Sequence, residues 1–143
     1  MQRNRRTRIL VEDQTDLALQ LAQEADGLFP VVVREPAHPG LMMTRVRESA
    51  QNTLFYLGEV LVTRARVSIN EQSGLGLLQG EEREKALALA VIDAAYPLLP
   101  DEKKASWDAL LQTAEEQIQL QQTIRHKQAA GTKVSFDTME VEQ

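Results

Sequence analysis

Two arginines, Arg64 and Arg66, have the spacing best suited to chemistry in this chain. They belong to an alternating run, residues 60–69, in which every second side chain falls on the same side of an extended strand. That side begins apolar with Val60 and Val62 and then turns cationic, which places the two guanidinium groups about 7 Å apart. Such a pair suits an anion such as phosphate, or an acidic partner surface. The solvated end of an ordinary strand has the same pattern, so both interpretations stay open.

The acid that directly precedes this run is Glu59, which follows Gly58. A carboxylate at this position could act as a general acid or base, or accept a hydrogen bond from a partner. It could equally balance Arg64 or Arg66 across a sheet. The sequence does not decide between these roles.

Other residue types that support catalysis or ligand binding are scarce. The chain has no cysteine, which excludes disulfides, thiolate metal sites and iron–sulfur ligation. His38 and His126 are far apart, and neither has a partner at the spacing of a zinc motif, so we interpret both as surface residues. A phosphate-binding loop and a dinucleotide-binding fingerprint are also absent from the sequence. We therefore expect no self-contained active site, no metal and no cofactor bound by this chain.

Length and charge set further limits. The 143 residues are enough for a single domain, residues 1–143, with one core. The formal net charge of −5 argues against nucleic acid as a partner. No apolar run approaches the roughly 20 residues that a membrane span needs, so we expect no membrane association and a cytoplasmic location. Arg3, Arg5, Arg6 and Arg8 form an N-terminal cluster, either an arm for phosphate or a partner, or a solvated helical turn or frayed end.

The first half of the chain predicts one helix and a series of strands. Residues 9–29 have helical character, with Thr15 or Asp16 as a cap. Residues 31–35 and 41–47 predict a hairpin whose loop holds the turn residues Pro36, Pro39 and Gly40. A polar loop, residues 48–54, and an approach turn ending at Gly58 lead into the long strand. After a turn at residues 70–74, the strand 75–79 pairs back, and its Gly76 permits close backbone approach or a bulge.

The second half predicts two helices and a last strand. A helix begins with acids at residues 81–84 and ends before Pro97. A second helix of about 25 residues starts at Asp101, and its apolar stripe fades after Ile118, so it leaves the core or continues onto a partner. Residues 133–141 alternate as a final strand. This order predicts an α+β domain with a largely antiparallel sheet of about five strands, an N-terminal helix and two C-terminal helices.

Three segments in this order resemble the PhnG family, the small subunit of the bacterial carbon–phosphorus lyase core complex. The first is Pro39-Gly40-Leu41 followed by residues 55–65, Phe-Tyr-Leu-Gly-Glu-Val-Leu-Val-Thr-Arg-Ala. The second is Gln-Gly-Glu-Glu-Arg at residues 79–83 with Ile-Asp-Ala at residues 92–94, and the third is Lys-Val-Ser-Phe-Asp-Thr-Met at residues 133–139. Together they span nearly the whole chain.

The resemblance implies a role in phosphonate metabolism. Members assemble with PhnH-, PhnI- and PhnJ-like subunits into a symmetric core with two copies of each, so a second copy of this chain belongs to the same complex. With a PhnL-like protein, this core displaces adenine from MgATP by an alkylphosphonate and yields an α-D-ribose 1-alkylphosphonate 5-triphosphate. The nucleosidase-type chemistry is attributed to the PhnI partner and the later radical cleavage to PhnJ. MgATP is thus a substrate of the complex, and the catalytic centre is expected on partner subunits.

Three hypotheses follow. In the first, the chain is a required, non-catalytic subunit, and residues on the long strand and the last strand contact a partner or a phosphate: Gly58, Glu59, Thr63, Arg64, Arg66, Phe136, Thr138 and Met139. Gly58 and Glu59 are expected to shape the turn before the strand. The second hypothesis is a stand-alone module that forms homodimers through the long C-terminal helix, without phosphonate activity. The third is an anion-binding enzyme that uses Arg64 and Arg66.

Overall fold

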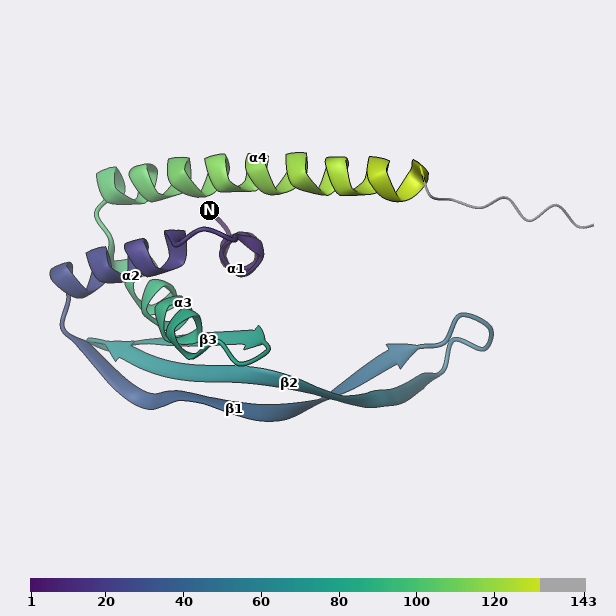
Figure 1. Cartoon of the computed structure of the whole chain (residues 1–143). Coiled ribbons are helices and arrows are strands. Elements are labelled where there is room, and N and C mark those ends of the chain that lie inside the picture. Colours follow the sequence, from purple (N-terminus) through teal and green to yellow (C-terminus); the bar gives the residue numbers. More distant parts are fainter. Residues whose placement is uncertain (132–143) are drawn as a thin grey trace, which may run out of the picture.

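The computed structural model describes residues 1–131 and shows an α+β fold with its helices on one face of the sheet (Figure 1). The helices are α1 (Arg3–Glu12), α2 (Leu17–Leu28), α3 (Arg83–Ala95), a short 3-10 turn η1 (Tyr96–Leu98) and α4 (Asp101–Gly131). Helix α3 lies directly on the sheet, α1 and α2 form the next layer, and α4 lies over them. This arrangement confirms the predicted fold class with N-terminal and C-terminal helices.

The sheet has three antiparallel strands in the described part of the chain, in the order β1-β2-β3. They are β1 (Val31–Arg47), β2 (Leu54–Ile69) and β3 (Gln72–Gln79). The prediction of about five strands is not confirmed. One reason is that the segments 31–35 and 41–47 are a single strand, β1, and the hairpin predicted between them is wrong. The last predicted strand, residues 133–141, lies outside the described residues.

Strand β1 passes through two prolines because it is an edge strand. Proline lacks an amide donor and is therefore tolerated where that donor faces away from the sheet, or at a bulge. The pairing of β1 with β2 shifts register between Val33 and Glu35 and again between Glu35 and His38, an interval that contains Pro36. Pro39 pairs with Thr63 in regular register. The second irregularity therefore takes up Pro36, and the strand continues through both prolines.

Helix α3 approaches β3 closely at two glycines. A Cβ atom on Gly76 would lie 1.8 Å from the carbonyl oxygen of Ala86, and one on Gly74 would lie 2.0 Å from that of Ala90. Only residues without a side chain fit at both positions. The close approach that the sequence predicts at Gly76 is confirmed.

The N-terminal segment forms two helices where the sequence predicts one over residues 9–29. Helix α1 begins at Arg3, and the break falls at residues 13–16, where the Asp13 side chain accepts hydrogen bonds from the backbone amide and the hydroxyl of Thr15. Asp16 occupies the N-cap position of α2 without a side-chain capping hydrogen bond, while the Thr15 hydroxyl oxygen accepts from the amide of Leu17, the first residue of the helix. Because α1 begins before the predicted helix, the N-terminal arginines are part of it.

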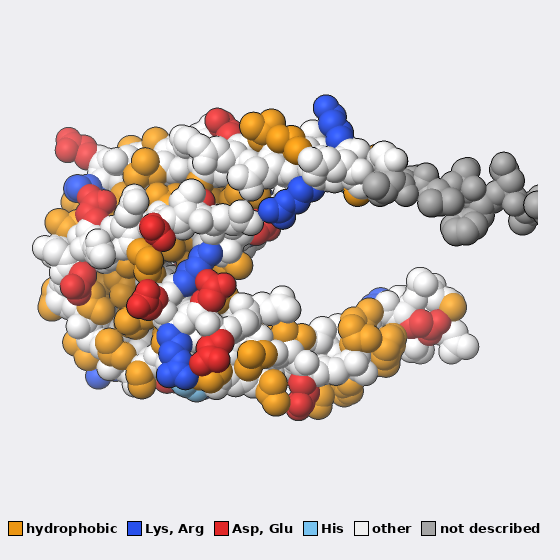
Figure 2. Space-filling view, in the orientation of Figure 1, with side chains coloured by type: hydrophobic (Ala, Val, Ile, Leu, Met, Phe, Trp, Pro, Cys, Tyr) orange, Lys and Arg blue, Asp and Glu red, His pale blue; other side chains and the backbone are white. Residues whose placement is uncertain are grey.

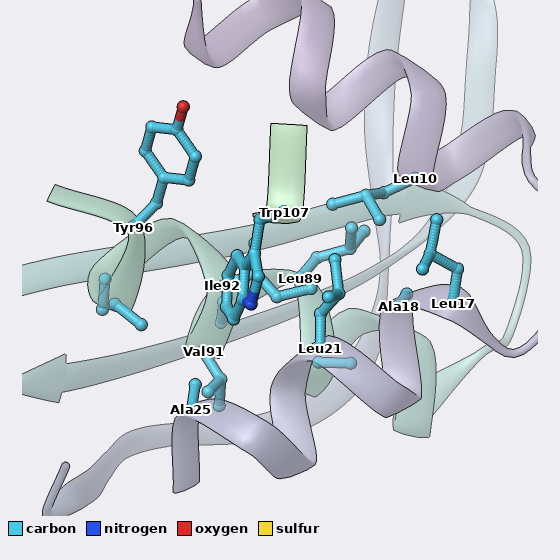
Figure 3. Packing of buried hydrophobic residues seen from close by; sticks show 14 of the residues in the cluster. Leu10, Leu17, Ala18, Leu21, Ala25, Leu89, Val91, Ile92, Tyr96 and Trp107 are labelled. Atoms are coloured by element: carbon cyan, nitrogen blue, oxygen red, sulfur yellow. The ribbon is translucent and has the colours of Figure 1, made fainter. Parts of the chain in front are cut away.

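The core lies between one face of the sheet and the helices α1, α2, α3 and the first half of α4. Trp107 of α4 is fully buried and packs with Ile92 of α3 and Leu21 of α2 (Figure 3). The indole nitrogen of Trp107 donates to Glu24 at 2.9 Å. Beyond Ile118, α4 is exposed, which confirms the prediction that this helix leaves the core, although it is longer than predicted at 31 residues.

Two arms extend past the core in the same direction. One is the second half of α4, and the other is the far end of the β1–β2 pair (Figure 1). The space-filling view shows a hollow between them and many apolar side chains along the sheet arm (Figure 2). The sheet arm therefore presents an apolar surface beyond the core.

Candidate functional site

The sheet arm is a two-stranded ribbon, because β3 pairs with β2 only from Val62 to Ile69. Among residues 1–131, the strand segment 54–60 of β2 pairs with β1 alone. We call residues 39–47 of β1 and 54–61 of β2 the distal ribbon. Its large apolar side chains are exposed at Leu41, Met42, Met43, Val46, Leu54, Phe55, Tyr56, Leu57 and Leu61, up to 66% for Leu41.

The apolar side chains cover both faces of the distal ribbon. Leu41 lies opposite Leu61 in the register, and the next pair, Met42 with Val60, points to the other face because strand side chains alternate. A sheet packed on one core shows apolar residues on one face and polar residues on the other. An isolated two-stranded ribbon is also only marginally stable in water. Both properties mark the distal ribbon as a candidate interaction surface.

The pairing of the two strands in the distal ribbon has one irregularity. Thr44 pairs with Gly58 and Arg45 with Tyr56, so the β2 strand holds one extra residue there. Gly58 adopts a φ of +154°, which glycine allows, and the Arg45 guanidinium lies 6.0 Å from the Tyr56 ring centroid. Gly58 and Glu59 thus lie inside β2, and the prediction that they shape a turn before the strand is wrong.

The two predicted arginines lie on the face of the sheet away from α3. Arg64 is half-exposed and binds Glu35 of β1 with a nitrogen–oxygen distance of 2.5 Å. The hydrogen bond from Arg64 holds the pKa of the Glu35 carboxyl below its ordinary value. Arg66 is exposed and pairs with Glu35 in the strand register. Arg64 therefore binds an acid of the neighbouring strand, Arg66 lies beside the same acid in the register, and the face they occupy has mixed charge.

Thr63 lies on the opposite face of β2 and is fully buried. Its hydroxyl donates to the carbonyl oxygen of Gly80 at 2.6 Å and accepts from the amide of Glu82 at 3.2 Å. The side chain therefore fastens β2 to the segment that leads into α3. The other predicted contact residues, Phe136, Thr138 and Met139, lie outside the described residues.

The N-terminal arginines have a role that the sequence does not reveal. Arg3 and Arg6 bind Asp93 of α3, and Arg5 and Arg8 bind Glu115 of α4. Asp93 also accepts from the amide of Leu75 at the outer edge of β3, at 3.1 Å. The cluster holds α1 against α3 and α4, so the interpretation as a frayed end is wrong. Arg3, Arg5 and Arg8 nevertheless have exposed side chains at the start of a helix, as a solvated helical turn predicts.

Arg6 is the most enclosed of these arginines. Its side chain is buried, and its guanidinium stacks 4.1 Å from the centroid of the Tyr96 ring. Burial lowers the pKa of Arg6, while Asp93 opposes that effect. The Tyr96 hydroxyl donates to Asp108 at 2.8 Å, and burial with this bond raises the pKa of Tyr96 to about 12. No motif signals this cluster, because its partners are widely separated in the sequence.

A cleft of about 930 Å³ lies between the α1–α2 connection and the start of α3. Most of the charged residues in its lining are acidic, and the Lys85 ammonium in it donates to the carbonyl oxygens of Val11 and Asp13 at the end of α1. In the described residues, no three His, Asp or Glu side chains are grouped so as to hold a metal ion. None of the helices within residues 1–131 has the length and apolar character of a membrane span.

A family model described as "Phosphonate metabolism protein PhnG" matches residues 1–141. The chain belongs to the PhnG family. The match covers essentially the whole sequence, including the distal ribbon and the N-terminal arginines, and it confirms the resemblance found in the motifs. A search of curated proteins finds no match. Membership of the PhnG family implies involvement in phosphonate metabolism.

Proposed function

We propose that this PhnG-family chain is a required, non-catalytic subunit of the carbon–phosphorus lyase complex. In this role it supports transfer of the ribose triphosphate moiety of MgATP to an alkylphosphonate, with release of adenine, in the cytoplasm. The catalytic centre lies on partner subunits. The partners are PhnH-, PhnI- and PhnJ-like subunits, a PhnL-like protein and a second copy of this chain.

The observation that supports this proposal most is the distal ribbon, which is apolar on both faces and extends beyond the core. Burying one large apolar side chain contributes about 1.5–3 kcal/mol, so a partner that covers several of them gains considerable affinity. A partner also explains why a marginally stable two-stranded ribbon keeps its length. The ribbon is thus the surface through which the subunit joins the complex.

A matched pair of variants tests this role of the ribbon. Leu41 of the ribbon and Leu120 of α4 are similarly exposed, at 66% and 62%. Leu41→Asp removes about 2 kcal/mol of transfer free energy at the contact, which corresponds to about thirtyfold in affinity. We expect tagged Leu41→Asp protein, co-expressed with its partner subunits, to recover far less of them than Leu120→Asp protein does.

The homodimer alternative predicts that the variant in α4, and not the variant in the ribbon, has the larger effect on assembly. If α4 mediates self-association, Leu120→Asp disrupts a homodimer and Leu41→Asp does not. Mass measurement by light scattering on both variants, alone and with partners, separates the two functions. Recovery of partners at the wild-type level by both variants would show that neither arm is the docking surface.

Arg64 is a predicted contact residue that is exposed next to the ribbon. Because its pair with Glu35 is exposed, Arg64→Ala should leave the thermal unfolding of the isolated chain nearly unchanged. We expect the same variant to weaken recovery of the partner subunits. Unchanged recovery and unchanged adenine release would remove Arg64 from the interface.

A further inference from the structure

The edges of the sheet differ in whether their backbone groups are available to pair with another strand. The outer edge of β1 carries two prolines and two register shifts close to the core, features that oppose pairing with another strand. At the outer edge of β3, the Asp93 carboxylate binds the amide of Leu75. Strand β2 has an unpaired edge of its own, because β3 ends beside it at Gln79. In the described part of the chain, residues 54–60 of β2 continue without a second neighbouring strand.

The first open position on β2 is Glu59. The amide of Gly80 donates to the carbonyl oxygen of Leu61 at 2.9 Å, so the backbone of Leu61 points to the side that β3 occupies. In an antiparallel sheet the backbone groups of a strand alternate between its two neighbours. No register shift separates Glu59 from Leu61, so the backbone amide and carbonyl of Glu59 also point to that side, past the end of β3.

We propose that this edge of β2, residues 54–60, receives an extended segment of a partner subunit, which continues the sheet where β3 ends. The inference rests on the proposed function and deepens it by naming the docking mode. An added strand supplies hydrogen bonds to the open backbone groups, and alternating apolar residues on it match the two apolar faces of the ribbon. The ribbon then becomes three-stranded along its length.

Charge identifies the occupant as a partner strand and not a second copy of this chain. The open edge ends beside Gly80, which is followed by the exposed acids Glu81, Glu82 and Glu84, of which Glu81 pairs with Arg83. A closed pair of two copies through this edge is two-fold symmetric and antiparallel, which brings the loop at residues 48–53 to those acids, together with Arg47 and Glu48, whose charges cancel. Self-pairing therefore offers Glu82 and Glu84 no net opposite charge. A partner strand with a lysine or arginine at that end complements them.

The test compares proline and alanine at Glu59, because proline removes the amide that faces the open edge and alanine keeps it. The same pair at Met43, which lies opposite Glu59 and faces the outer edge of β1, serves as the reference. Each variant carries a tag and is co-expressed with the partner subunits, and circular dichroism of the isolated variant checks its fold. We expect at least about tenfold lower partner recovery for Glu59→Pro than for Glu59→Ala. The two Met43 variants should differ little.

Each other outcome contradicts a stated part of the inference. Equal recovery of partner subunits by Glu59→Pro and Glu59→Ala would show that this edge of β2 is not the docking site. Recovery of partners by the wild-type chain would still support the proposed function. A wild-type chain that recovers no partners overturns both. Conversion of a wild-type homodimer into a monomer by Glu59→Pro makes a second copy the occupant.

Amide hydrogen exchange gives a second measurement on the unmodified chain. We expect the Glu59 amide to exchange freely in the isolated chain and to become protected in the complex. Protection in an isolated monomer would mean that the chain covers its own edge, which overturns the proposal.

Discussion

Replacing Gly76 with alanine tests the contact that fixes α3 on the sheet. The new methyl group would lie 1.8 Å from the carbonyl oxygen of Ala86, 2.9 Å from its carbonyl carbon and 2.9 Å from the amide nitrogen of Ala90. All three atoms belong to the helix backbone, so no side chain can rotate away to make room. Helix α3 must move as a whole, and Ala90, Ile92 and the rest of its buried face must move with it.

The expected loss of folding stability is large for the addition of one methyl group. Overpacked cores lose about 1–3 kcal/mol, and a clash with rigid backbone belongs at or above the upper end. For a chain of this size, about 3 kcal/mol corresponds to a decrease of roughly 6–12 °C in the unfolding midpoint. Thermal and urea unfolding of the isolated chain, followed by circular dichroism, measure this change.

Gly27→Ala is the matched control. Gly27 lies in α2, and a Cβ atom there would meet nothing within 4 Å. Alanine has the higher helix propensity, so this variant should gain about 0.5–1 kcal/mol. An unfolding midpoint for Gly76→Ala at or above that of wild type would refute the close helix–strand contact.

The remaining predictions concern the buried polar contacts. Thr63→Val should lose about 1–3 kcal/mol of stability, because the Gly80 carbonyl and the Glu82 amide lose their partner, whereas Thr63→Ser should keep most of it; urea unfolding compares the two. Asp93→Asn should lower the free energy of unfolding by about 3 kcal/mol, since it leaves buried Arg6 without its acid. The control Glu81→Gln breaks an exposed pair with Arg83 and should change the free energy of unfolding by less than about 0.5 kcal/mol. The pKa of Tyr96 is raised to about 12 in the folded chain, above its ordinary value of 10, so stability should fall as pH rises from 10 to 12. That fall should be shallower in Tyr96→Phe, and equal slopes would contradict the assignment.

The sequence predicts the elements where local signals and tertiary packing agree. Gly76 signals a close approach because a glycine inside a strand leaves backbone exposed, and α3 fills that space. The alternation along residues 60–69 also predicts the faces of β2 correctly, with Ala65, Val67 and Ile69 buried and Arg64 and Arg66 exposed. Helix α4 leaves the core where its apolar stripe ends.

The sequence misleads where edge position changes the meaning of a residue. Pro36, Pro39 and Gly40 are turn residues in most contexts, but an edge strand can hold them because its outer amides need no partner. Gly58 is likewise consistent with a turn or with an irregularity inside a strand. Knowing that β1 is an edge requires knowledge of the whole sheet, which local pattern does not provide.

The N-terminal arginines were unpredictable for a different reason. Each binds an acid more than 85 positions away, with Arg6 and Asp93 separated by 87 positions. A charge cluster has no periodicity that identifies such partners. The predicted contact residues also differ in burial. Arg64 and Arg66 are on the sheet surface, while Thr63, one position before Arg64, is buried in the fold.

Adenine release by the reconstituted complex tests the central claim most directly. PhnH-, PhnI- and PhnJ-like subunits and a PhnL-like protein from the same organism are combined with MgATP and methylphosphonate, with and without this chain. The account predicts adenine release that depends on methylphosphonate and is lost when this chain is omitted. Release at the same rate without the chain would contradict its role as a required subunit.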